Sequence, residues 1–134
     1  MQLGLVISLS LHILASVFWA GTSFTLARTG GAGGEQLFRP QMGAAVVAML
    51  AGAYLWTQFH AGGTGTTERI LGAGVVCALL AAAVQGVIGG PAVAALRRGS
   101  TDDISARSRI ALAQRIASGL LGVTLVCMAT ARYV

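Results

Sequence analysis

Four long apolar runs dominate this sequence and restrict what it can fold into. They cover roughly residues 3–27, 41–59, 70–96 and 110–131, and each is near the ~20 residues that a helix needs to cross ~30 Å of hydrocarbon. A membrane barrel would instead need strands of about 10 residues with alternating polarity. The sequence therefore predicts an all-α fold, a four-transmembrane-helix bundle with up-down topology. We expect the helices at about 3–27, 41–60, 70–96 and 104–132.

The composition supports one membrane domain over residues 1–134. Of the 134 residues, 55% are hydrophobic and 10% are charged, whereas a soluble domain carries about a quarter charged residues. A chain of this length leaves no room for a separate soluble catalytic module. The first run lacks a preceding positive charge and is too long for a signal peptide, so we expect it to stay attached.

Arginine supplies all of the positive charge and predicts the orientation. The nine basic residues give a net charge of +5, and they gather at segment ends, which is typical of membrane loops and argues against nucleic acid. The first and third loops hold Arg28, Arg39, Arg97, Arg98, Arg107 and Arg109. Because such loops face the cytoplasm, we expect both termini on the outer side of a bacterial-type inner (plasma) membrane.

The connections carry recognisable turn and cap residues. We expect a flexible loop over residues 28–39, whose glycine run at 30–34 lacks the lysine of a phosphate loop. Pro40 suits the first turn of the second helix. Another loop, at 61–67, ends in Thr67, which can cap the third helix and is followed by Glu68.

The third helix and its following loop contain two further signals. The sequence Gly89-Gly90-Pro91 predicts a kink or an end, because proline removes a backbone hydrogen bond. Ser100 and Asp103 resemble a capping box for a fourth helix that begins before its membrane portion.

His12 is the strongest single functional signal, because a titratable group roughly 13 Å into the membrane is a functional candidate. Serines and a tryptophan share its face at helical spacing, and this face consists of Ser8, His12, Ser16, Trp19 and Ser23. We expect His12 to bind a ligand or to carry a proton. The alternative is a neutral histidine hydrogen-bonded to a serine or to a carbonyl of a neighbouring helix.

His60 ends an inward stripe on the second helix that consists of Met42, Val46, Met49, Ala53, Trp56 and His60. Antiparallel packing brings it toward the half of the membrane that holds His12, but straight helices leave a depth difference of about 10 Å. His60 is thus a candidate second metal ligand or a solvated interfacial residue. Met49 is a deeper candidate partner, or else part of the core.

The third helix carries small residues at four-residue intervals, which favour close packing with a neighbouring helix. They are Gly74, Ala78, Ala82, Gly86 and Gly90. Gln85, beside them, needs a polar partner across the bundle. Cys77, Cys127 and Met128 lie in the same half of the membrane as His12, so the four could bind copper(I) as soft ligands. Alternatively, the two cysteines are simply small apolar residues buried in the bundle.

Three arginines are candidate partners for the carboxylates of a cofactor. Arg115 lies about five residues inside the fourth run, beside Gln114, where it either reaches the interface or pairs with a haem propionate. Arg69 and Arg132 lie at the outer ends of their helices. They could bind a propionate or serve as interfacial anchors.

The stretch Leu11-His12-Ile13-Leu14-Ala15-Ser16-Val17-Phe18-Trp19-Ala20-Gly21, which runs on to Phe24 and Arg28, resembles the first helix of a membrane family. This family includes the copper-resistance protein CopD and the small protoporphyrinogen oxidase HemJ. The resemblance implies that His12 is an axial haem ligand or a copper-site histidine and that Arg28 matches the family's basic residue. Arg69 stands where HemJ has a lysine, and the fourth helix lacks an Asn-Glu pair, so the resemblance supports the cofactor more than the oxidase activity.

These observations lead us to expect a haem b-binding membrane protein with a redox or electron-transfer role. His12 is the expected ligand, with His60 or a methionine as the second, and the protein is either an oxidoreductase or a non-catalytic subunit of a larger respiratory assembly. Expected partners are membrane lipid, a quinone or a membrane redox complex. The alternatives are copper handling through His12, Met49, Cys77, Cys127 and Met128, and a structural accessory subunit without cofactor.

Overall fold

Helices make up almost all of the chain that this computed structural model describes, residues 2–99 and 102–134. In chain order they are α1 (Gln2–Arg28), α2 (Gly34–Phe59), α3 (Thr66–Val84), the short π-helix η1 (Gln85–Gly89), α4 (Gly90–Arg98) and α5 (Asp103–Ala131). Four helical stretches are long and apolar enough to cross a membrane, because α3, η1 and α4 together form one interrupted span, Thr66–Arg98. The expected all-α, four-span architecture of a multi-pass membrane protein is confirmed.

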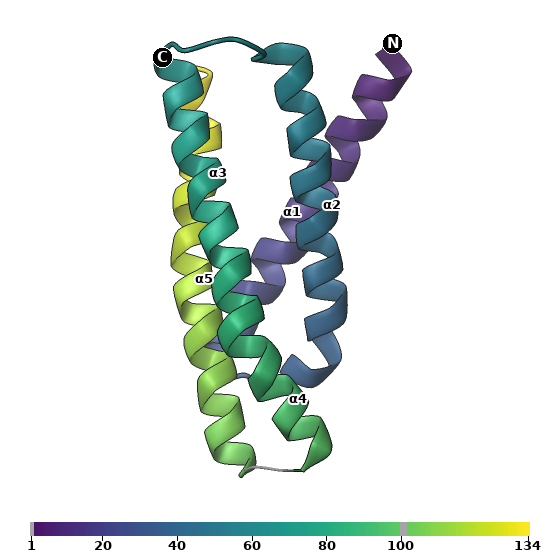
Figure 1. Ribbon diagram of the computed structural model, residues 1–134, viewed down its shortest axis with the longest axis vertical. Helices are drawn as coiled ribbons and strands as arrows, with labels where there is room; N and C mark the ends of the chain where they lie inside the picture. The colour runs from purple at the N-terminus through teal and green to yellow at the C-terminus, as the bar shows by residue number, and fades with distance from the viewer. Residues whose placement is uncertain (1, 100–101) are drawn as a thin grey trace.

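The spans alternate in direction and pair as α1 with α2 and as α3 with α5 (Figure 1). Both termini lie at one end of the bundle, together with the α2–α3 connection; we call this the terminal end (Figure 1). The opposite end, residues 28–39, 97–99 and 102–109, is the arginine-rich end. α1 crosses the bundle obliquely, so that it also contacts α5. The orientation of the two ends in the membrane remains a prediction.

α2 begins seven residues earlier than expected, at Gly34. The glycine-rich segment is consequently a tight turn, and Pro40 lies inside the helix instead of in its first turn. Contacts with α5 explain the early start: Glu35 forms an ion pair with Arg107 at 3.1 Å. Gly31 has φ +84°, and a Cβ there would lie 2.6 Å from the Arg107 carbonyl oxygen, so only glycine suits this turn.

The third span begins with a cap that uses the expected glutamate. α3 starts at Thr66, one residue before the expected cap residue Thr67. The carboxylate of Glu68 accepts a hydrogen bond from the Gly65 N–H at 3.0 Å. This bond satisfies one of the donors that a helix start leaves unpaired.

The expected break in the third span takes the form of a π-helix immediately before Pro91. Upstream of it, the buried face of α3 steps from Ala78 to Ala81, three residues on, as the 3.6-residue turn of an α-helix requires. The buried line therefore runs through Ala81, Gln85 and Gly89, whereas Gly86 has open space around it. The expected four-residue stripe is correct at its start, Gly74 and Ala78, and wrong at Gly86.

α5 begins where the sequence indicated, although its cap differs. The Asp102 side chain accepts a hydrogen bond from the Ile104 N–H at 3.3 Å and caps the helix. Of the expected capping box, Asp103 is the first residue of α5, and Ser100 lies outside the described residues.

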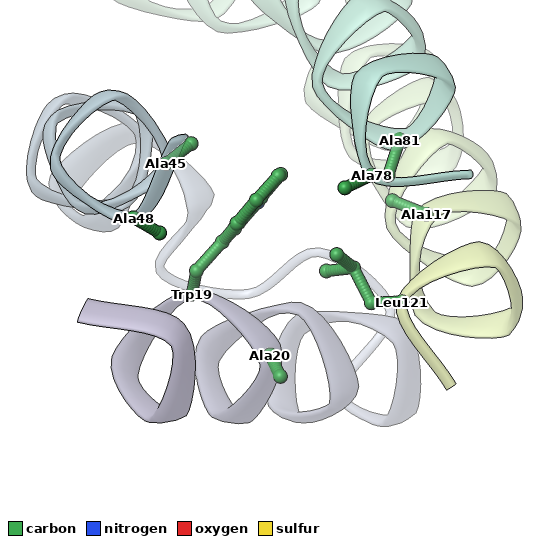
Figure 2. Packing of buried hydrophobic residues seen from close by; sticks show 8 residues of the cluster. All are labelled: Trp19, Ala20, Ala45, Ala48, Ala78, Ala81, Ala117 and Leu121. Atoms are coloured by element: carbon green, nitrogen blue, oxygen red, sulfur yellow. The ribbon is translucent and has the colours of Figure 1, made fainter. Parts of the chain in front are cut away.

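The apolar centre of the bundle consists mainly of alanine around one large ring (Figure 2). Trp19 extends from α1 between α2 and the α3–α5 pair. The other buried members are Ala20, Ala45, Ala48, Ala78, Ala81, Ala117 and Leu121. Small side chains let helix backbones approach closely, which is the usual source of helix association in membranes.

A buried network of amide side chains joins all four spans beside this core. Gln41 and Gln114 exchange hydrogen bonds at 2.9 and 3.2 Å. Gln85 donates to Gln114 at 2.9 Å and to Ser23 at 2.7 Å. Among the described residues, no buried side-chain nitrogen or oxygen lacks a partner, so the network is fully satisfied and fixes how the helices fit together.

Candidate cofactor cavity

A cavity of about 560 Å³ lies between the spans in the half of the bundle nearer the terminal end. Residues of α1, α2, α3 and α5 line it, almost all of them apolar. Leu50 and Phe59 line the cavity and are also 68% and 63% exposed, so it is open at the side of the bundle. This volume and lining match those of small-molecule and cofactor sites, which occupy about 300–1,000 Å³.

His12 lines this cavity from α1 and is half-buried. Its Nδ1 lies 2.8 Å from the carbonyl oxygen of Ala48 on α2. A carbonyl oxygen only accepts hydrogen bonds, so Nδ1 carries a proton, and in the neutral imidazole Nε2 then keeps its lone pair. The hydrogen bond to a carbonyl of a neighbouring helix, which the sequence left open as an alternative to ligand binding, is therefore formed by one of the two ring nitrogens.

Nε2 of His12 has no hydrogen-bond partner among the described residues. Because no buried side-chain nitrogen in this part of the chain is left unpaired, Nε2 is accessible at the protein surface or in the cavity. Histidines that bind metals typically have this arrangement, with Nδ1–H on a carbonyl and Nε2 free for the metal.

Gly52 supports the ring of His12 from α2, a role that the sequence analysis missed. A Cβ at this position would lie 2.9 Å from Cε1 and 3.2 Å from Nδ1 of His12. The absent side chain thus provides the space in which the imidazole lies against the α2 backbone. Nothing in the spacing of the α2 residues indicated this contact, because it depends on how α1 crosses α2.

Trp19 is held at the inner limit of the cavity by the buried amide network. Its indole N–H donates to Oε1 of Gln85 at 2.7 Å, and its side chain is 3% exposed. Ser16 lines the cavity one turn from His12. Ser23, two turns from Ser16, belongs to the amide network. The expected polar face of α1 is therefore divided between the cavity and the network, except for Ser8, which belongs to neither.

His60 lies just after α2, at the terminal end of the cavity. Its Nδ1 is 2.9 Å from the Glu68 carboxylate, and its ring stacks at an angle on Trp56 with centroids 5.6 Å apart. His60 follows Gly52 by eight residues, a helical rise of about 12 Å. Both histidines therefore line the same cavity, but they lie far apart along its length.

The sulfur-containing candidates separate into two groups. Met49 and Met128 line the cavity with His12, whereas Cys77 and Cys127 are half-buried free thiols outside its lining. Within residues 2–99 and 102–134, no group of three or more His, Cys, Asp or Glu side chains is suited to a metal ion. The soft-ligand set proposed for copper is therefore only partly assembled.

None of the three candidate arginines lines the cavity. Arg69, in the first turn of α3, and Arg132, directly after α5, lie at the terminal end and are exposed. Arg132 stacks on Tyr133 at 5.4 Å. Arg115 points to the end of α1, where its Nε is 3.5 Å from the Ala27 carbonyl oxygen. Arg69 and Arg132 are thus closer to the cavity's end of the bundle than Arg115.

Comparison of the chain with models of known protein families, with curated proteins and with solved structures finds no match. The resemblance of the first helix to the CopD and HemJ family thus stays a prediction, and the case for a function depends on the cavity and on His12.

Proposed function

We propose that this protein binds haem b in the cavity, with Nε2 of His12 as a ligand of the iron, and transfers electrons within the membrane. The observation that carries the proposal is the anchored imidazole: Nδ1 bonds the Ala48 carbonyl, while Nε2 is free beside an apolar cavity of about 560 Å³. Orientation of a histidine through its second nitrogen both fixes the ring and raises its basicity toward a metal.

Two features of the cavity lining, and two arginines outside it, fit such a group. The lining is almost entirely apolar, which excludes water from a flat macrocycle. Trp19, at its inner limit, offers an aromatic face. The exposed guanidinium groups of Arg69 and Arg132 lie at the terminal end, where they could bind propionates.

A methionine is a better second ligand than His60 in this proposal. Met49 and Met128 line the same cavity, and methionine–histidine ligation is an established haem coordination. His60 lies about 12 Å along α2 from the point where His12 packs, and its Nδ1 is engaged by Glu68. We assign His60 to the cavity mouth.

Haem b would supply one-electron redox chemistry. The chain itself would bind the iron, orient it through His12 and shield it from water. The open side of the cavity supports exchange with a quinone or a larger membrane redox complex. We place the chain in a bacterial-type inner membrane, and the arginine counts of its loops support an orientation with both termini outward.

Copper handling is a weaker candidate because the two cysteines lie outside the cavity that holds His12, Met49 and Met128. A purely structural accessory role would leave unexplained why a histidine with a free nitrogen lines a cavity of this size.

Absorption spectra of the purified protein, loaded with haem, test the proposal. We expect a Soret band that shifts on reduction with dithionite, its loss or displacement in His12→Ala, and its retention in His60→Ala. Size-exclusion chromatography and circular dichroism establish that both variants fold. A folded wild-type protein that takes up no haem, or a His12→Ala spectrum identical to that of the wild type, would refute the proposal.

A further inference from the structure

A second cavity, of about 350 Å³, lies at the arginine-rich end between the first turns of α2 and one face of α4. From α4 it is lined by Gly90, Val93, Ala94, Arg97 and Arg98, and from α2 by Phe38 and Arg39. We call it the arginine crevice. It shares no lining residue with the candidate cofactor cavity, so its role is independent of the proposed function.

The arginine crevice is apolar at its base and cationic at its rim. Phe38 packs against Gly90, where a Cβ would lie 3.4 Å from the phenyl Cζ. Val93 is buried beside it. Arg39, Arg97 and Arg98 are all exposed.

No ion pair in the described part of the chain neutralises the arginines of the crevice. No acidic residue lines it, and Arg39 and Arg98 have no hydrogen-bond or ion-pair partner in the described part of the chain. Arg97 is fixed by a hydrogen bond to the Glu35 carbonyl oxygen, which occupies only part of its five-donor guanidinium group.

Three carboxylates lie at this end of the bundle, and one of them, Asp103, interacts with Arg107. Both oxygens of Glu35 bond Arg107 at 3.1 Å, and Asp102 caps α5. Arginine binds phosphate oxygens bidentately, so three guanidinium groups around one opening favour a phosphate group.

The position of the crevice in the fold identifies the kind of phosphate compound. It lies at the end of helices long and apolar enough to cross a membrane, where phospholipid headgroups are found, and at its base Phe38 packs against the buried apolar cluster of Val93, Ala92 and Ile110. Basic pockets between transmembrane helices bind the headgroups of anionic lipids.

We propose that the arginine crevice binds an anionic phospholipid, with the phosphate on Arg39, Arg97 and Arg98 and the start of an acyl chain along the Phe38 side. Zwitterionic lipids carry the same phosphate but add a cation that these arginines repel. The site thus selects anionic over zwitterionic headgroups.

Native mass spectrometry of the full chain in detergent, titrated with dioleoylphosphatidylglycerol or dioleoylphosphatidylcholine, tests this proposal. The test variant is Arg39→Gln/Arg98→Gln, because neither side chain has a partner whose loss would unfold the protein. The matched control is Arg28→Gln/Arg109→Gln, which removes two exposed arginines from the same end but outside the crevice. We expect the test variant to bind phosphatidylglycerol about 30-fold more weakly and the control to change by less than about threefold.

Three outcomes would overturn the proposal. Equal losses in the two double variants would mean that the whole face attracts anionic lipid without a specific site. Equal binding of the two lipids by the wild type would show that the charge of the headgroup is not recognised. Inorganic phosphate that displaces the lipid at matched concentrations would show that the crevice takes free phosphate.

Discussion

Gly52→Ala provides a sharp test of how α2 positions His12. The added Cβ would lie 2.9 Å from Cε1 of His12, whereas carbon atoms in contact settle at about 3.5–4.0 Å. The imidazole must therefore move by roughly 0.6 Å or more, and its 2.8 Å bond to the Ala48 carbonyl must lengthen or tilt. Loss of such an orienting bond weakens metal binding about 10- to 100-fold, so we expect a haem affinity lower by that factor.

The change in stability should be small by comparison. Overpacking costs about 1–3 kcal/mol, and replacement of a helical glycine by alanine recovers about 1 kcal/mol. We therefore expect the free energy of unfolding to fall by no more than about 2 kcal/mol. Haem titration followed by Soret absorbance measures the affinity, and reversible unfolding in mixed micelles measures the stability.

Gly43→Ala is the matched control, because Gly43 also lies in α2 but has nothing within 4 Å of its would-be Cβ. It should bind haem as the wild type does. Wild-type affinity in Gly52→Ala, or an equal loss in Gly43→Ala, would refute the positioning role of Gly52.

Two further substitutions test the framework that holds the cavity. Gln85→Leu removes the acceptor of a buried indole N–H and should lower the free energy of unfolding by about 1–3 kcal/mol, whereas exposed Gln58→Leu should leave it unchanged in the same unfolding assay. Equal stability of the two variants would contradict the structural role of the amide network. In Gly31→Ala, alanine must adopt φ +84° and its Cβ lies 2.6 Å from a carbonyl oxygen, so the free energy of unfolding should fall by about 3 kcal/mol or more. In Gly30→Ala the added Cβ meets no neighbour, so the free energy of unfolding should fall by only about 1 kcal/mol. Similar melting temperatures for the two alanine variants would contradict the account of the turn.

Much of the fold follows from hydropathy alone, because a run of some 20 apolar residues has few alternatives to a spanning helix. α1 and α5 end within one residue of their expected bounds. The start of α2 could not be predicted, since it depends on Glu35 meeting Arg107, 72 residues away. Local glycine content predicted a flexible loop where these contacts impose a tight turn.

The sequence indicated several side chains of the candidate site, since His12, His60, Met49 and Met128 all line the cavity. His12 was indicated because an intramembrane imidazole is costly without a role. The sequence indicated neither the role of Gly52 nor the cavity itself, because both depend on the oblique crossing of α1 and on the space between α2 and α3. By sequence, Gln41 is only the first residue of an apolar run. Its buried partnership with Gln114 requires knowledge of which helix faces meet.

Chemical rescue tests the central claim, the coordination of iron by Nε2 of His12, most directly. In His12→Gly, free imidazole can enter the space that the side chain leaves. The account predicts that the haem-loaded variant has an altered Soret band and that added imidazole restores the wild-type spectrum in a saturable manner, whereas the His60→Gly spectrum does not respond. If His12→Gly is folded, binds haem with the wild-type spectrum and does not respond to imidazole, the coordination of iron by His12 is contradicted.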